Sequence, residues 1–170
     1  PAVSYESLRD RLYYFAKIGK LKRLRQGIYT KEKYNSLELV NKLYKPSYIS
    51  LETVLQREGV TFQYYETIFA MSYLSREITL ENINIRYRQI KKEVLLNPAG
   101  IEEKTGYFIA DKERAFLDAV YLYKDYHFDN LGSLDWEKIE DLKKIYKSKA
   151  FEKRVNSYYH DYLEEENVKH

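Results

Sequence analysis

The stretch from Ser4 to Thr30 constrains the fold most, because it joins a helix pattern to a glycine and a short hairpin pattern. Leu8, Leu12 and Phe15 recur at spacings of four and three residues, which predicts an amphipathic helix with one apolar face. Ser4 is the predicted N-cap, and Gly19 is the residue type that ends helices in a left-handed conformation. An apolar face of this kind must pack on the C-terminal part of the chain or on a second copy.

Two short runs of β-prone residues follow the predicted helix, Leu21 to Leu24 and Ile28 to Thr30. Arg25, Gln26 and Gly27 separate them, and the glycine supplies the positive φ that a tight hairpin turn needs. A helix followed by a two-stranded wing is the C-terminal half of a winged helix-turn-helix. We therefore expect residues 1–33 to form this partial winged helix and residues 34–170 to form a second domain.

The positive charge of the chain is concentrated in its first domain. Residues 1–33 hold nine Lys or Arg residues against three acidic residues, a net of +6, whereas the whole chain carries +3. Cations on a wing are placed to meet DNA phosphates, a contact that positions a protein without reading sequence. The residues that we expect to contact DNA are Arg9, Arg11, Tyr13, Lys17, Lys20, Lys22, Arg23 and Arg25. The alternative is a solvated basic hairpin that binds no nucleic acid.

Helix and strand patterns alternate in the second domain. The predicted helices run from Ser36, as N-cap, to Pro46, from Leu51 to Arg57, from Asp111, as N-cap, to Tyr123, from Asp135 onward, and from Lys149 to about Leu163. The predicted strands are 67–73, 83–87, 93–96 and 106–110, with a loop at 97–104. The fold class is therefore α+β, with a mixed or antiparallel sheet flanked by helices and a helical C-terminus. Five cations could form a second basic surface, or simply the polar face of a half-exposed sheet: Arg76, Arg86, Arg88, Lys91 and Lys92.

Catalytic patterns are poor in this chain. Glu102 and Lys104 resemble the acidic-x-Lys pair of metal-dependent nucleases, but such triplets arise by chance in a chain with 32% charged residues. Ser50 has no histidine nearby to act as its base, and Asp118 is best interpreted as a structural anion. His127 and Asp129 could touch a metal, yet a loop histidine is more often simply exposed. We expect no enzyme activity, no catalytic residue, no metal site and no cofactor.

Composition excludes several kinds of site and indicates where the protein is located. The chain has no cysteine, which excludes disulfides, thiolate zinc sites and a cysteine nucleophile. No run approaches the roughly 20 apolar residues that span a bilayer, and the N-terminus lacks a signal-peptide pattern. We expect a cytoplasmic protein with no membrane partner.

Three blocks of this sequence resemble one protein family. The blocks are LRQGIYT (24–30), PSYISLETVL (46–55) and IADKERAFLDAVYL (109–122), in the order in which the AbiEi-like antitoxins of bacterial type IV toxin-antitoxin systems carry them. The resemblance implies an abortive-infection antitoxin in phage defence, which is also a transcriptional regulator. Such a protein binds operator DNA through a winged helix and counters a nucleotidyltransferase-type toxin, directly or through the toxin's target.

The start of the chain departs from the family pattern. A winged helix has two helices before its recognition helix, and only Pro1, Ala2 and Val3 precede Ser4. We therefore expect either a fragment or a family member that has lost these helices, and weak operator binding by this chain alone. The alternative function is a non-enzymatic protein-interaction module with a vestigial or dimerising winged-helix remnant, which includes a possible homodimer.

Overall fold

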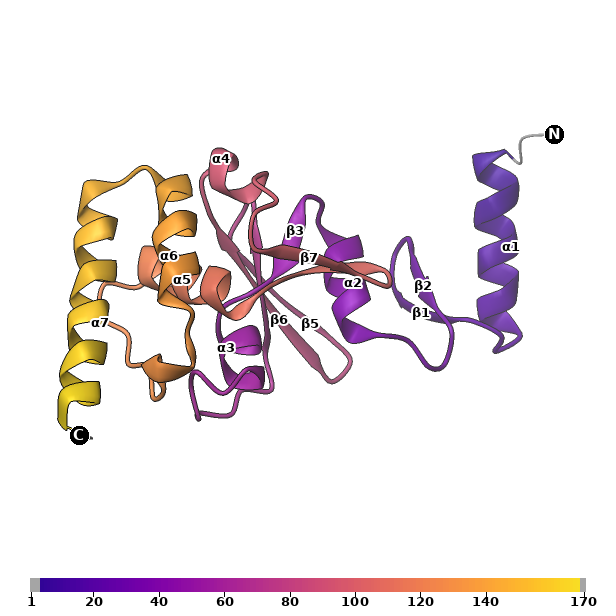
Figure 1. Cartoon of the computed structure of the whole chain (residues 1–170). Helices are drawn as coiled ribbons and strands as arrows, with labels where there is room; N and C mark the ends of the chain where they lie inside the picture. The colour runs from indigo at the N-terminus through magenta and orange to yellow at the C-terminus, as the bar shows by residue number, and fades with distance from the viewer. Residues whose placement is uncertain (1–3, 169–170) are drawn as a thin grey trace.

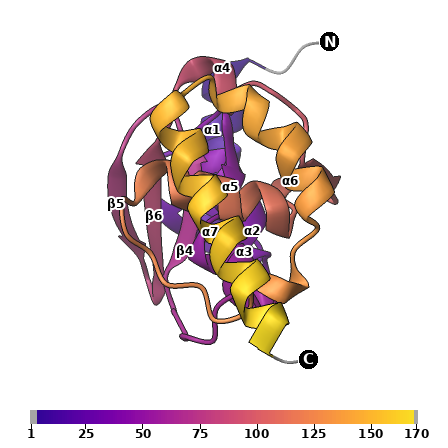
Figure 2. The same ribbon diagram turned by 60° about the vertical axis from the view of Figure 1, so that its left-hand side comes forward.

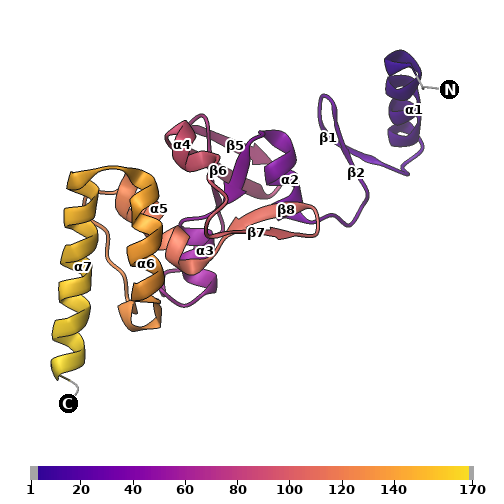
Figure 3. The ribbon, with the colours of Figure 1, turned by 45° about the horizontal axis from the view of Figure 1, so that its top comes forward.

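The computed structural model describes residues 4–168, which form an elongated molecule. Helix α1 (Tyr5–Lys17) stands at one end and helix α7 (Lys149–Val168) at the other, with a β-sheet between them (Figures 1 and 3). The N-terminal helix is joined to the rest of the molecule through a small hairpin. Helices α1 and α7 therefore lie far apart in space.

The predicted helix and hairpin are both present at the N-terminus. The Ser4 hydroxyl accepts a hydrogen bond from the Ser7 amide at 3.2 Å and so caps α1, while Gly19 has a φ of +75°. Strands β1 (Lys22–Arg25) and β2 (Ile28–Thr30) form a separate antiparallel sheet. A helix and a hairpin do not by themselves establish a winged helix, and that assignment stays a prediction.

The body of the protein is built on a six-stranded mixed sheet. The strand order is β5-β6-β4-β3-β8-β7, in which β6 runs parallel to β4 and β3 parallel to β8, and the other neighbours are antiparallel. Of the two sheet types predicted, the mixed one is confirmed. The strands are β3 (Ser47–Ile49), β4 (Ile68–Ser72), β5 (Arg76–Leu80), β6 (Ile83–Gln89), β7 (Ile101–Lys104) and β8 (Tyr107–Ala110).

Helices cover both faces of this sheet. Tyr87 on β6 donates a hydrogen bond to the Val40 carbonyl of α2 (Ser36–Leu43), so α2 lies on one face. Tyr48 on β3 donates to Asp118 of α5 (Lys112–Leu122), so α5 lies on the other. Helices α3 (Glu52–Arg57), α6 (Trp136–Leu142) and α7 gather on the side of α5, where α7 crosses in front of it (Figure 2). The short 3-10 turns η1 (Leu131–Ser133) and η2 (Lys143–Tyr146) precede and follow α6.

Two predictions between residues 93 and 104 are wrong. The strand expected at 93–96 is a single helical turn, α4 (Lys92–Leu95), because Val94 and Leu95 are consecutive and both buried, whereas a strand would send them to opposite faces. The expected loop at 97–104 contains strand β7 instead. A two-residue turn ending in Gly106, with φ of +89°, folds β7 back on β8.

Other element boundaries shift or were missed. Strands β3 and β5 were not predicted, and α7 extends five residues beyond the expected end at Leu163. Asn35 rather than Ser36 caps α2, because its side chain accepts the Leu37 amide at 2.9 Å. Asp111 and Asp135 do cap α5 and α6, as predicted. Helix α2 ends at Leu43, three residues before Pro46, and the remaining predicted elements differ from the structure by one or two residues at their ends.

Candidate functional site

The basic residues predicted to meet DNA all lie on the arm formed by α1, β1 and β2. Seven of the eight are cations and all eight are exposed: Arg9, Arg11, Tyr13 and Lys17 on α1, Lys20 in the connection, and Lys22, Arg23 and Arg25 on β1. Residues 9, 13 and 17 follow one another at four-residue spacing and share one side of the helix, whereas Arg11 lies on another. The arm thus presents its positive charge in more than one direction.

An irregularity in the hairpin divides the cations of β1 between its two faces. Lys22 pairs with Thr30 and Arg25 pairs with Ile28, whereas Arg23 pairs with the intervening Tyr29. Because side chains alternate along a strand, Lys22 and Arg25 lie on one face of the hairpin and Arg23 on the other. The cations of β1 therefore do not share one face of the hairpin.

Three of the predicted residues do converge in a hollow between α1 and the hairpin. This hollow, of about 530 Å³, is lined by Arg9 and Tyr13 from α1 and by Arg23 from β1. Leu8 and Leu12 contribute its apolar part. Asp10 also lines the hollow and pairs with Arg9 at 3.2 Å, so the hollow combines this ion pair, the Arg23 guanidinium and an apolar floor. We call it the arm groove.

The opposite face of the hairpin is tied to the body. The Lys22 ammonium lies 2.7 Å from the Glu81 carboxylate in the β5–β6 turn, and the hydrogen bond with Glu81 raises the pKa of Lys22. Both side chains are at least one-third exposed, so the pair orients the arm more than it stabilises the fold.

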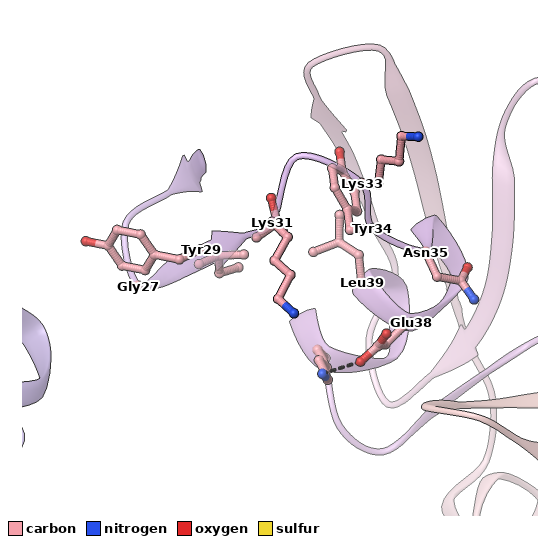
Figure 4. A pocket seen from close by; sticks show the side chains of 11 residues that line it. Gly27, Tyr29, Lys31, Lys33, Tyr34, Asn35, Glu38 and Leu39 are labelled. Atoms are coloured by element: carbon pink, nitrogen blue, oxygen red, sulfur yellow. Dashed lines mark hydrogen bonds and ion pairs between the residues drawn. The ribbon is translucent and has the colours of Figure 1, made fainter. Parts of the chain in front are cut away.

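A second hollow, of about 560 Å³, lies where the hairpin meets α2 (Figure 4). Lys31 reaches into this hollow, while the carboxylate of Glu38 is paired with Lys42 on the next turn of α2. Lys33 also lines it. Lys31 and Lys33 belong to the basic residues 1–33, and Lys42, which no sequence pattern indicated, lines the same hollow. Their common location depends on the fold, and no spacing in the sequence could have identified Lys42.

The second basic surface considered from the sequence is largely satisfied by contacts within the chain. Arg86 lies 2.7 Å from the Glu77 carboxylate on the paired strand, and Arg76 donates to the Tyr44 hydroxyl at 3.0 Å. Arg88 donates to the Tyr123 hydroxyl at 3.4 Å and lies over its ring. These contacts favour the interpretation as the polar face of a half-exposed sheet.

Beneath Arg88 lies a buried carboxyl group that the sequence did not indicate. Glu52 is 5% exposed, and one of its oxygens accepts a hydrogen bond from Tyr123 at 3.0 Å, while the other has no hydrogen-bond partner within the described residues. Burial raises the pKa of Glu52, and Tyr123 and Arg88 offset this only in part. The hydrogen bond from Tyr123 joins the first residue of α3 to the C-cap of α5.

Asp118 is the centre of a second buried polar cluster, as its interpretation as a structural anion predicts. It accepts hydrogen bonds from Tyr48 at 3.0 Å, from Ser50 at 2.8 Å and from Tyr146 at 2.7 Å. The Arg114 guanidinium completes the cluster. Ser50 therefore donates its hydroxyl hydrogen to a buried carboxylate.

The weak catalytic patterns do not assemble into a site. Glu102 and Lys104 form an exposed ion pair with each other on β7, and His127, whose side chain is 87% exposed, lies 3.5 Å from Asp129. Among residues 4–168, no three His, Asp or Glu side chains come together in a way that could hold a metal ion.

Comparison with known protein families and with curated protein sequences finds no match for this chain. Within the part of the chain that the structure describes, no helix is both long and apolar enough to cross a lipid bilayer.

Proposed function

We propose that this chain is an AbiEi-like antitoxin and transcriptional autoregulator, located in the cytoplasm, that binds operator DNA through its N-terminal arm. The observation that carries the proposal is the arm itself, in which a capped helix and an antiparallel hairpin project from the body with seven exposed cations. Exposed cations on a helix and hairpin are suited to phosphates, because each contact releases counterions from the duplex.

The antitoxin part of the proposal is assigned to the body. All buried hydrophobic residues of the described chain lie between Leu39 and Val155, so the body has a core of its own. This body counters a nucleotidyltransferase-type toxin through binding, either of the toxin or of the toxin's target.

The arm is tested by the salt dependence of binding to the promoter of the protein's own operon. Replacement of Lys20, Lys22, Arg23 and Arg25 with alanine should flatten the slope of log affinity against log salt by about 0.9 for each phosphate that is no longer neutralised. The matched control replaces four lysines at the far end of the molecule, Lys144, Lys147, Lys149 and Lys153, and should leave the slope unchanged. An unaltered slope in the arm variant would show that the hairpin is not on DNA.

Binding is measured in parallel for residues 1–170 and for the protein as its gene encodes it. If the gene encodes helices ahead of Ser4, we expect residues 1–170 to bind more weakly, because α1 would lack the support that a recognition helix normally has. Specific nanomolar binding by residues 1–170 would contradict this expectation.

A second candidate function is favoured by the apolar face of α1. Tyr5 is 80% exposed and Leu8 is 50% exposed, which is typical of a surface that binds another protein. In this interpretation the chain is a non-enzymatic interaction module, and its arm is a vestigial or dimerising remnant. The same titration distinguishes the two functions, because the module would show no salt-dependent promoter binding.

A further inference from the structure

Helix α1 has no support within the described part of its own chain. It is 13 residues long and contains no buried residue. Isolated helices shorter than about 12–15 residues are marginal in water, because few hydrogen bonds offset the cost of nucleation. Its apolar residues Tyr5, Leu8, Leu12 and Phe15 repeat at spacings of three, four and three, which is the pattern of a seam that packs on another helix. We therefore expect the apolar side of this helix to pack on a partner.

The residues that line the arm groove indicate which side chains a partner helix needs. Its floor is apolar, with Leu8 and Leu12 from α1, and Tyr29 lines the hairpin side. Arg9 and Arg23 line the same hollow together with Asp10, which pairs with Arg9 at 3.2 Å, so the lining carries a net charge of +1 that rests on Arg23. The groove thus suits an amphipathic helix that has apolar residues and carboxylates together.

The far end of the same chain carries such a helix. The second half of α7 has no buried residue after Val155 within the described range. Tyr159 and Leu163 are 40% and 39% exposed, and the covered side of Tyr159 lies against Trp136 of α6, with 5.1 Å between the ring centroids. Residues 155–168 contain no Lys or Arg, whereas four carboxylates lie within six residues: Asp161, Glu164, Glu165 and Glu166. They stand at the C-terminal end of the helix, where the helix dipole is itself negative and favours cations.

We propose that the acidic half of α7 from one copy docks in the arm groove of a second copy. Tyr159 and Leu163 would meet Leu8 and Leu12, and the carboxylates would meet the guanidinium groups. One chain cannot make this contact with itself, since α1 and α7 lie at opposite ends of the molecule (Figure 1). The association is therefore head to tail, and it continues from copy to copy unless the rotation closes a ring.

Charge favours this arrangement over the pairing of α1 with itself. Arg9 and Arg11 lie on the two sides of the apolar seam, one residue after Leu8 and one before Leu12. An antiparallel pair of α1 helices would bring these flanking cations near those of the other copy, and Asp10 offsets only Arg9. The α7 helix brings carboxylates to them instead. Because one helix face buries less than a standard interface of about 1,200 Å² or more, we expect weak, concentration-dependent association.

The test is sedimentation velocity of the chain over a range of concentrations at low and at high salt. We expect the average mass to rise with concentration at low salt and to return to the monomer value at high salt, where charge contacts are screened. Two charge-reversal variants test the two surfaces one at a time. The first combines Arg9→Glu with Arg23→Glu in the groove, and the second combines Glu164→Lys with Glu165→Lys on α7. Each should weaken self-association by about tenfold or more.

An equimolar mixture of the two variants is the decisive sample. The reversed groove of one variant complements the reversed helix of the other, so the mixture should associate although neither variant does alone. This recovery also shows that both variants remain folded. Glu58→Lys with Glu93→Lys, at exposed carboxylates of the body, is the matched control and should associate like the parent chain.

Three results would overturn the proposal. The first is a chain that stays monomeric at every concentration at low salt. The second is association that the α7 variant leaves intact, which would show that copies meet through α1 alone. The third is a mixture that stays monomeric. Because none of these measurements contains DNA or a toxin, they stand apart from the proposed antitoxin function.

Discussion

Arg114 and Asp118 face each other one turn apart on α5, with 3.6 Å between Nε and Oδ1 and neither side chain exposed. The other groups of the guanidinium donate to the carbonyls of Ala99 and Val94, both at 2.7 Å. This pair therefore fastens the loop before β7 and the end of α4 to α5, while the Asp118 carboxylate holds β3 and η2 through tyrosine hydroxyls. It connects elements that are far apart in the sequence.

Asp118→Asn should destabilise the protein severely. The substitution keeps the shape of the side chain but leaves the buried Arg114 charge without its counterion, which typically costs about 3–5 kcal/mol. Urea unfolding followed by circular dichroism measures the loss. Asp141→Asn, which removes an exposed ion pair with Lys144, is the control and should change little. Equal midpoints for the two variants would show that Asp118 has no special role.

The buried carboxyl of Glu52 should make the protein less stable as pH rises, whereas a carboxylate in an ion pair makes a protein more stable as pH rises. Its folded-state pKa is raised above the ordinary value of 4.5. The native state therefore binds the proton more tightly, and the stabilisation from this proton is present below 4.5 and is lost as pH rises through the raised value.

Glu52→Gln removes this titration while an amide oxygen can still accept from Tyr123. The free energy of unfolding of the parent chain, relative to this variant, should fall from about pH 4 to about pH 7. Glu93→Gln, at an exposed position, is the control. A difference that rises with pH would mean that the pKa of Glu52 is lowered in the folded state.

Phe116→Ala should cost about 3–5 kcal/mol, a large part of the roughly 5–15 kcal/mol of a typical domain. Phe116 is completely buried on α5, and its ring lies against those of Phe128, Trp136 and Tyr158. Phe108→Ala, at a ring that is 46% exposed on β8, is the matched control and should cost much less. If the Phe116→Ala and Phe108→Ala variants unfold at similar urea concentrations, the aromatic cluster does not support the core.

Antitoxin activity should survive removal of the arm. Residues 34–170 contain the six-stranded sheet and every buried hydrophobic residue of the described chain, and a domain of this size commonly folds alone. The assay co-expresses residues 34–170 with the neighbouring toxin gene and scores growth, with promoter repression measured in parallel. We expect rescue without repression.

Circular dichroism of residues 34–170 is the control for folding. If rescue and repression disappear together while this fragment remains folded, the two functions are not separable and the division of the chain at residue 33 is wrong.

Local patterns were sufficient for much of the secondary structure. The caps at Ser4, Asp111 and Asp135, the turn at Gly27 and the alternation along 83–87 each depend on neighbouring residues, and the structure confirms them. The edge strands β5 and β7 escaped prediction because they carry charged residues and few apolar ones, which suits an exposed sheet edge but hides the strand pattern. The turn α4 was mistaken for a strand because four residues are too few to distinguish the two periods.

For the candidate site, too, some features follow from local sequence patterns and others only from the fold. Charge and periodicity are properties of neighbouring residues, so they were enough to predict that the first 33 residues are basic and carry an amphipathic helix. Three facts depend on the folded chain: Arg9 and Arg23 share one groove, Lys22 instead reaches Glu81, and α1 lies far from the body. The physical reason is that a hairpin irregularity of one residue reverses the face of a side chain, and that contacts such as Arg114 with Val94 join segments that no local pattern relates.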